Sequence, residues 1–116
     1  MERAIPQCVR PSIQQRAGLA RSLALKPEVL LLDSPLTGLD VRHMVWWLGF
    51  LGELARGHRS LDSKPLTIVA TADDLRPWRK HASQVACLSR RQLLVLGDWV
   101  AVAGCREPVV KELLRE

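Results

Sequence analysis

The chain has 116 residues, a length that suits one small domain or part of a larger one. Its hydrophobic fraction of 47% and charged fraction of 25% are those of a globular protein, and they exclude an intrinsically disordered chain. The net charge of +5 is compatible with a phosphate-rich partner or an anionic membrane surface, although arginine-rich usage that reflects only the source is the simpler interpretation.

The three cysteines, Cys8, Cys87 and Cys105, form no CxxC pair. The first residues, "MERAIPQCVRPS", contain no apolar stretch of the kind that directs secretion. An odd number of cysteines without a signal peptide predicts a reducing, cytoplasmic setting.

The first predicted element is a helix in "SIQQRAGLARSLAL", which Lys26–Pro27 ends. Ser12 is its expected N-cap, with Gln15 at the capping-box position. Helical spacing places four residues on its expected apolar face, with Leu23 close by: Ile13, Ala17, Ala20 and Ala24.

The segment "EVLLLD" predicts a short strand that ends in Asp33. Because the strand is wholly apolar, we expect it to be buried on both faces and central in a parallel sheet. After the turn "SPLTG", Asp40 is the expected cap of a helix that Gly57 closes. The segment "LTIVAT" predicts a second buried strand, rich in β-branched residues.

The second half of the chain begins with Asp73 and Asp74, which could bind a metal but more simply cap a helix near Leu75. Two short strands joined by a tight turn are predicted in "SQVACLS" and "RQLLVLG", and Cys87 is expected in the core. The segment "DWVAVAG" fits a strand or a short helix, and "REPVVKELLRE" predicts a terminal helix. The alternation of helices and strands predicts an α/β fold with a mainly parallel sheet.

A buried strand that ends in an acid is a recurrent way to hold a metal ion. The carboxylate lies at the carboxyl edge of the sheet, where open α/β sheets bind ligands. Proteins that transfer phosphate use such an acid to hold Mg²⁺. The alternative is a strand end that only happens to precede an acidic helix cap.

The run "QQRAGLARSLALKPEVLLLDSPLTGLD" closely resembles the ATP-binding subunits of ABC transporters, in which a signature helix, the Walker B strand and the D-loop follow one another at this spacing. The resemblance implies the C-terminal part of a P-loop NTPase (RecA-like) domain, a single partial domain over residues 1–116. Its parts would be the signature helix (12–25), Walker B and D-loop (29–40), the switch segment (66–74) and the C-terminal strands and helix (83–116). The D-loop and C-terminal pattern are similar to the lipid-importer branch of the family.

The resemblance also implies roles for individual residues. Asp33 matches the magnesium-coordinating acid, and Gly38, Leu39 and Asp40 match the D-loop that contacts the opposing subunit. Ser12, Gln14 and Gln15 fall in the nucleotide-contacting signature region. The implied cofactors are ATP and Mg²⁺. The implied partners are a second ATP-binding subunit and transmembrane permease subunits, with a location at the inner face of the plasma membrane.

The departures from the family pattern concern catalysis. Ser34 stands where the family has its catalytic glutamate, and a hydroxyl cannot usefully accept the proton of the attacking water. Ala72 stands where the family has its switch histidine, and Arg10, Pro11 and Ser12 replace the Ser-Gly-Gly signature. The sequence contains no Gly-Lys pair, so it has no P-loop. We therefore expect a degenerate chain that does not hydrolyse ATP alone.

Two other functions remain open at this point. Ser34 and Ala72 together fit a non-catalytic module that docks on a transporter or on a complete ATPase subunit. The basic patch Arg76–His81, with Trp78 inside it, combines charge with a stacking surface, as in domains that bind nucleic acid.

Overall fold

The computed structural model describes residues 11–114, with side chains from residue 13 onward. It divides into two compact units at the bond between Ala72 and Asp73. Each unit contains helices and one two-stranded sheet, so the chain has a mixed α/β structure.

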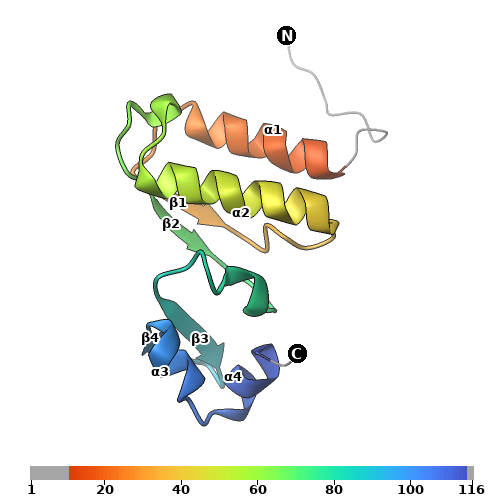
Figure 1. Cartoon of the computed structure of the whole chain (residues 1–116), viewed down its shortest axis with the longest axis vertical. Coiled ribbons are helices and arrows are strands. Elements are labelled where there is room, and N and C mark those ends of the chain that lie inside the picture. Colours follow the sequence, from red (N-terminus) through yellow and green to blue (C-terminus); the bar gives the residue numbers. More distant parts are fainter. Residues whose placement is uncertain (1–10, 115–116) are drawn as a thin grey trace. The chain divides into compact units, whose positions relative to one another are not determined.

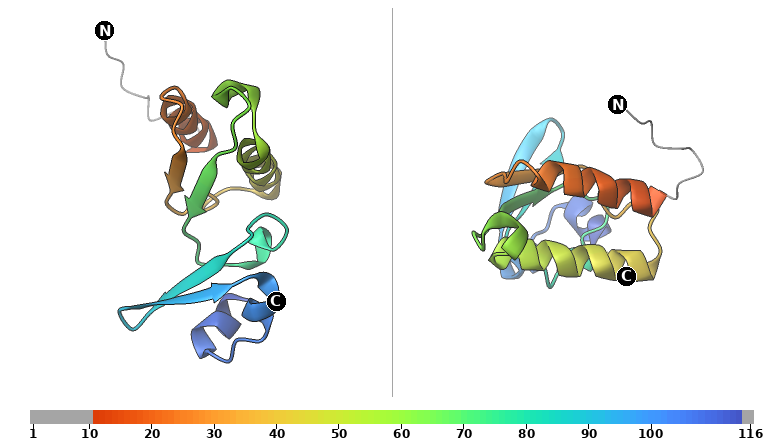
Figure 2. Two further views of the ribbon diagram at one scale, coloured as in Figure 1. Left: turned by 90° about the vertical axis from the view of Figure 1, so that its left-hand side faces the viewer. Right: turned by 90° about the horizontal axis from the view of Figure 1, so that it is seen from above.

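The first unit alternates helices and strands (Figure 1). Its elements are helix α1 (Pro11–Leu23), strand β1 (Val29–Leu32), helix α2 (Val41–Arg56), the short 3-10 helix η1 (Arg59–Leu61) and strand β2 (Thr67–Ala70). Helices α1 and α2 lie side by side and run in the same direction (Figure 2). The guanidinium of Arg16 lies 3.8 Å above the ring of Trp46 and joins the two helices by a cation–π contact.

Local signals determine where α2 begins and ends. Asp40 has an extended backbone, and its carboxylate accepts the N–H of His43, which confirms the predicted N-cap. At the other end Gly57 adopts φ 118°, and a Cβ at this position would lie 2.6 Å from the carbonyl oxygen of Ser63. Only glycine satisfies both constraints, so Gly57 ends the helix as predicted.

Strands β1 and β2 pair in parallel, with Leu30 opposite Ile68 and Leu32 opposite Ala70. The expected parallel pairing is confirmed, but the expected burial on both faces is wrong. Leu30 is buried, whereas its neighbour Leu31 is 74% exposed. Within residues 11–114 the sheet has two strands, so β1 is an edge strand and not the expected central one. Nothing in this range covers the sheet face that carries Leu31. The bare face carries three large apolar side chains: Val29, Leu31 and Val69.

The predicted apolar face of α1 is wrong for four of its residues, because Ile13 and the three alanines are exposed. Leu23, expected close to that face, is buried and anchors the helix together with Leu19. A buried leucine removes far more apolar surface from water than an alanine does, so the helix buries the face that carries the leucines. Leu54 and Trp47 of α2 are buried in the same unit.

The second unit begins with the short 3-10 helix η2 (Arg76–Trp78), at whose start Asp74 accepts the N–H of Arg76 at 3.0 Å. Strands β3 (Val85–Ser89) and β4 (Gln92–Gly97) form the predicted antiparallel hairpin. Helix α3 (Trp99–Ala103) resolves the open choice at "DWVAVAG" in favour of a helix, because Asp98 caps it through the N–H of Ala101. Helix α4 (Pro108–Leu113) follows. The core is Val85, Cys87, Val102 and Val110.

Candidate functional site

The candidate site lies where β1 and β2 end. The N–H of Thr71 donates to the carbonyl of Leu32 at 2.9 Å, which continues the parallel ladder one step beyond the strands. Asp33 and Thr71 are therefore the first residues after two neighbouring strands and lie at the same carboxyl edge. This is the position at which parallel α/β sheets bind ligands.

Thr71 holds Asp33 in place. Its hydroxyl donates to Oδ1 of Asp33 at 2.6 Å and accepts the N–H of Ser34 at 2.8 Å. Thr71 is not among the site residues predicted from the sequence, although the two predicted strands contain a signal for it. Aligning "LLLD" with "IVAT" places the acid beside the threonine.

Ser34 has a backbone φ of 49°, a left-handed conformation that costs a non-glycine residue about 1–2 kcal/mol. The hydrogen bond from its N–H to Thr71 helps to offset this cost. Its side-chain oxygen lies 3.5 Å from Oδ1 of Asp33, so the hydroxyl points its donor toward a carboxylate. A hydroxyl in this arrangement donates a proton and does not act as a base.

The oxygens gathered here suit a hard cation. Asp33 is exposed, and no hydrogen bond reaches its Oδ2 from the residues described. The hydroxyls of Ser34 and Thr71 lie beside it. Oxygen ligands of this kind fit Mg²⁺, which commonly takes one or two carboxylates together with phosphate oxygens and water. Between residues 11 and 114 no group of three or more His, Cys, Asp or Glu side chains is placed to hold a metal ion.

The loop from Asp33 to α2 is shaped by Gly38, which has φ 77° and open space around the position of a Cβ. The N–H of Leu39 donates to Leu36, and Leu39 is half-buried. The side chain of Asp40 is bound to the first turn of α2. Its Oδ1 accepts the backbone N–H of His43 at 2.9 Å and lies 2.8 Å from Nδ1 of the His43 ring. The hydrogen bond from the His43 backbone, followed by that from its ring, holds the pKa of Asp40 below its usual value of 3.8.

Among the described side chains, those of Gln14, Gln15 and Ala72 form no hydrogen bond with Asp33 or Thr71. Gln14 and Gln15 lie in the first turns of α1, and Oε1 of Gln15 is buried without a partner among the residues described. Ala72 follows Thr71 and is exposed. The side chain of Ser12, like Arg10, lies outside the described part of the chain.

Two residues of the basic patch Arg76–His81 are engaged within the fold. Trp78 is only 8% exposed, so its ring is unavailable for stacking on a base. Arg76 is paired with Asp74 by a contact of 2.8 Å. A pocket of about 250 Å³ is lined by Arg79 of this patch together with Trp99, Val102, Ala103 and Leu114.

No protein-family model matches the chain. Its sequence is 37% identical over 87 residues to a protein of Salmonella choleraesuis named as a 2-aminoethylphosphonate import ATP-binding protein, PhnT. This match covers 73% of the chain and 22% of PhnT. A match to mkl of Mycobacterium tuberculosis, named as a ribonucleotide transport ATP-binding protein, has 26% identity over 113 residues and covers 97% of the chain and 30% of mkl.

The chain is related to the ATP-binding subunits of ABC transporters. The relationship extends over most of the chain, as a partial homology, and the chain spans less than a third of the length of these ABC relatives. For the ABC family the relationship implies ATP and Mg²⁺ as cofactors and membrane transporter subunits as partners. Among the described residues, no helix is long and apolar enough to cross a bilayer.

Proposed function

We propose that the chain is the C-terminal portion of an ABC transporter ATP-binding subunit and that it supplies the magnesium side of an ATP site. The pairing of Asp33 with Thr71 at the carboxyl edge of two parallel strands supports this proposal most strongly. In it, the Asp33 carboxylate holds Mg²⁺, and Thr71 fixes the orientation of that carboxylate. The bound ion would neutralise negative charge on the phosphates of ATP.

In this proposal the chain does not hydrolyse ATP alone. Ser34 occupies the position next to the magnesium ligand, where a base would have to activate water, and its hydroxyl faces Asp33 as a donor. Ala72 offers no hydrogen bond at the predicted switch position. Removing a positioned acid–base group lowers a rate by about 10²–10⁴. The phosphate-binding loop would have to come from polypeptide outside this chain.

The proposed partners follow from the same assignment. The loop residues Gly38, Leu39 and Asp40 would face a second ATP-binding subunit, and Gln14 and Gln15 would lie at the nucleotide contact of the signature helix. Permease subunits would hold the assembly at the inner face of the plasma membrane. The lipid-importer branch of the family stays our prediction on the D-loop and C-terminal pattern.

A chimera tests the magnesium role. The 113 residues of mkl that align with this chain are replaced by the chain itself, so that the rest of mkl supplies the missing parts of the domain. We expect this chimera to bind a fluorescent ATP analogue in a Mg²⁺-dependent manner. Asp33→Asn should remove the Mg²⁺ dependence, and Asp62→Asn, a surface carboxylate paired with Lys26, serves as the matched control.

The same chimera tests the catalytic assignment. Ser34→Glu together with Ala72→His should raise its ATP hydrolysis by about 10²–10⁴, because the base and the switch side chain are restored together. If the chimera with Ser34 hydrolyses ATP as fast as the chimera with the two substitutions, the assignment of Ser34 to the base position is wrong. A chimera that folds but binds no nucleotide contradicts the proposal as a whole.

A second candidate function is a non-catalytic module that docks on a transporter or on a complete ATPase subunit. The bare apolar face of the β1–β2 sheet favours it, because parallel sheets are normally covered on both faces. Mixing the chain with full-length mkl and measuring complex formation by sedimentation tests this function. Complex formation that Leu31→Thr weakens would support docking through this face.

A further inference from the structure

The β3–β4 hairpin combines an apolar face with a cationic tip. In the register of the hairpin, Leu88 pairs with Leu93 and Ala86 pairs with Val95. These four residues, here called the hairpin patch, lie on the face opposite to core residues Val85 and Cys87. Leu88 and Val95 are each 77% exposed and Leu93 is 61% exposed.

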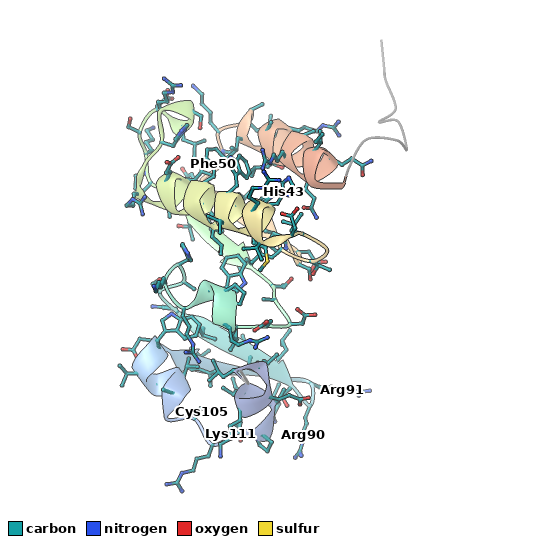
Figure 3. The ribbon with its side chains drawn as sticks, turned by 45° about the vertical axis from the view of Figure 1, so that its right-hand side comes forward. His43, Phe50, Arg90, Arg91, Cys105 and Lys111 are labelled. Atoms are coloured by element: carbon teal, nitrogen blue, oxygen red, sulfur yellow. The ribbon has the colours of Figure 1, made fainter. Side chains whose placement is uncertain are left out.

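Arg90 and Arg91 form the two-residue turn between the strands, and they project from the end of the hairpin (Figure 3). Their φ values are 50° and 63°, so both adopt the left-handed conformation. Two-residue turns of this type favour Asn-Gly, because glycine and asparagine tolerate a positive φ. Arginine is strained in the same conformation. Strain that persists at an exposed position is a reason to look for a function of the side chains that occupy it.

The charge at this tip is not neutralised. The hairpin, residues 85–97, contains no aspartate or glutamate. Neither Arg90 nor Arg91 forms an ion pair with any residue that the structure describes. Both side chains are exposed, so they can meet an external anion.

We propose that the hairpin docks on an anionic lipid surface, with the hairpin patch against the boundary of the acyl chains and both arginines on the headgroup phosphates. A ligand for this surface must offer flat apolar contact beside a dense array of negative charge, and the interface of an anionic bilayer offers both. Docking of this kind needs no nucleotide and goes beyond the proposed ATP function. It would give the chain a membrane contact of its own.

Flotation of the full chain with vesicles tests the proposal. We expect binding to vesicles of phosphatidylcholine mixed with phosphatidylglycerol, weaker binding in high salt, and little binding to phosphatidylcholine alone. Replacing the turn by Arg90→Asn with Arg91→Gly should weaken binding about 30-fold, since each basic residue at an anionic surface contributes about fivefold. The same double variant should raise the melting temperature because it relaxes the turn, so lost binding cannot be attributed to unfolding.

Two further variants separate the parts of the proposal. Leu88→Thr with Val95→Thr keeps strand propensity and should weaken binding while leaving the fold intact. Arg21→Ser with Arg59→Ser removes two exposed arginines from the first unit and should leave most binding in place. The proposal is overturned if the turn variant binds anionic vesicles as well as the unchanged chain. It is equally overturned if the chain binds no anionic vesicles, whether or not the Leu88 and Val95 variant dissociates a dimer.

Discussion

The hydroxyl of Thr71 donates a 2.6 Å hydrogen bond to Oδ1 of Asp33, a residue 38 positions earlier in the chain. The same hydroxyl accepts the N–H of Ser34 at 2.8 Å. Thr71 thus closes the end of β1 against the end of β2 through one oxygen atom. The orientation of the proposed magnesium ligand therefore depends on the residue that follows the neighbouring strand.

Thr71→Val should lower the free energy of unfolding by about 1 kcal/mol. Valine has nearly the shape of threonine, but the Asp33 carboxylate and the Ser34 N–H lose their hydroxyl partner. Urea denaturation followed by circular dichroism measures the change. Thr67→Val is the matched control, since Thr67 is exposed at the other end of β2 and its hydroxyl makes no hydrogen bond with the described residues. We expect the control to stay within about 0.5 kcal/mol of the unchanged chain. Equal effects of the two substitutions would show that the Thr71 hydroxyl adds nothing to stability.

Two glycines near α2 should respond in opposite directions to alanine. Gly57→Ala should destabilise the first unit by more than about 1 kcal/mol, because φ is 118° and the new Cβ would meet the carbonyl oxygen of Ser63 at 2.6 Å. Gly49→Ala should stabilise it by up to about 1 kcal/mol, because Gly49 lies inside α2 with nothing within 4 Å of the new Cβ. Thermal unfolding of both variants checks the signs. A Gly57→Ala variant as stable as the Gly49→Ala variant would contradict this account of the helix end.

Much of the fold could be predicted because its signals are local. Asp40 and Asp98 each precede an apolar run and each caps the helix that follows. Gly57 stands where only a residue without a Cβ fits. The ends of the helices therefore depend on one or two residues, which a single sequence displays directly.

The candidate site could be predicted only in part, because its geometry depends on pairing between distant segments. The strand motif indicated Asp33, but Thr71 entered the site only through the register of β1 with β2. The same limit explains why Leu31 was wrongly expected to be buried. An apolar side chain can be buried, but its own identity does not show whether another segment of the chain packs against it. The roles of Gln14 and Gln15 stay predictions for the same reason.

Lower pH should weaken the cap of α2. The pKa of Asp40 is lowered by the His43 backbone and ring, so its folded value lies below its unfolded value of about 3.8. The carboxylate therefore adds stability that is fully present above the unfolded pKa and is lost as pH falls through the folded pKa. We expect the urea midpoint to drop as the pH falls from the unfolded value of about 3.8 through the lower pKa of the folded chain. Asp40→Asn keeps a capping oxygen that does not titrate, so its midpoint should depend less on pH. Identical pH profiles for the two proteins would contradict the assigned cause.

The bare face of the β1–β2 sheet should make the chain associate with itself at high concentration. Leu31 and Val69 lie opposite each other in the register and are both exposed, so they form one apolar surface on an edge-exposed sheet. Replacing both by threonine keeps strand propensity and should reduce association by at least about tenfold in dissociation constant, as sedimentation equilibrium measures it. Leu25→Thr is the control, because Leu25 is 85% exposed in the turn after α1 and outside the sheet. An unchanged chain that remains monomeric at every concentration, or a control that acts as strongly as the double variant, would show that this face does not drive association.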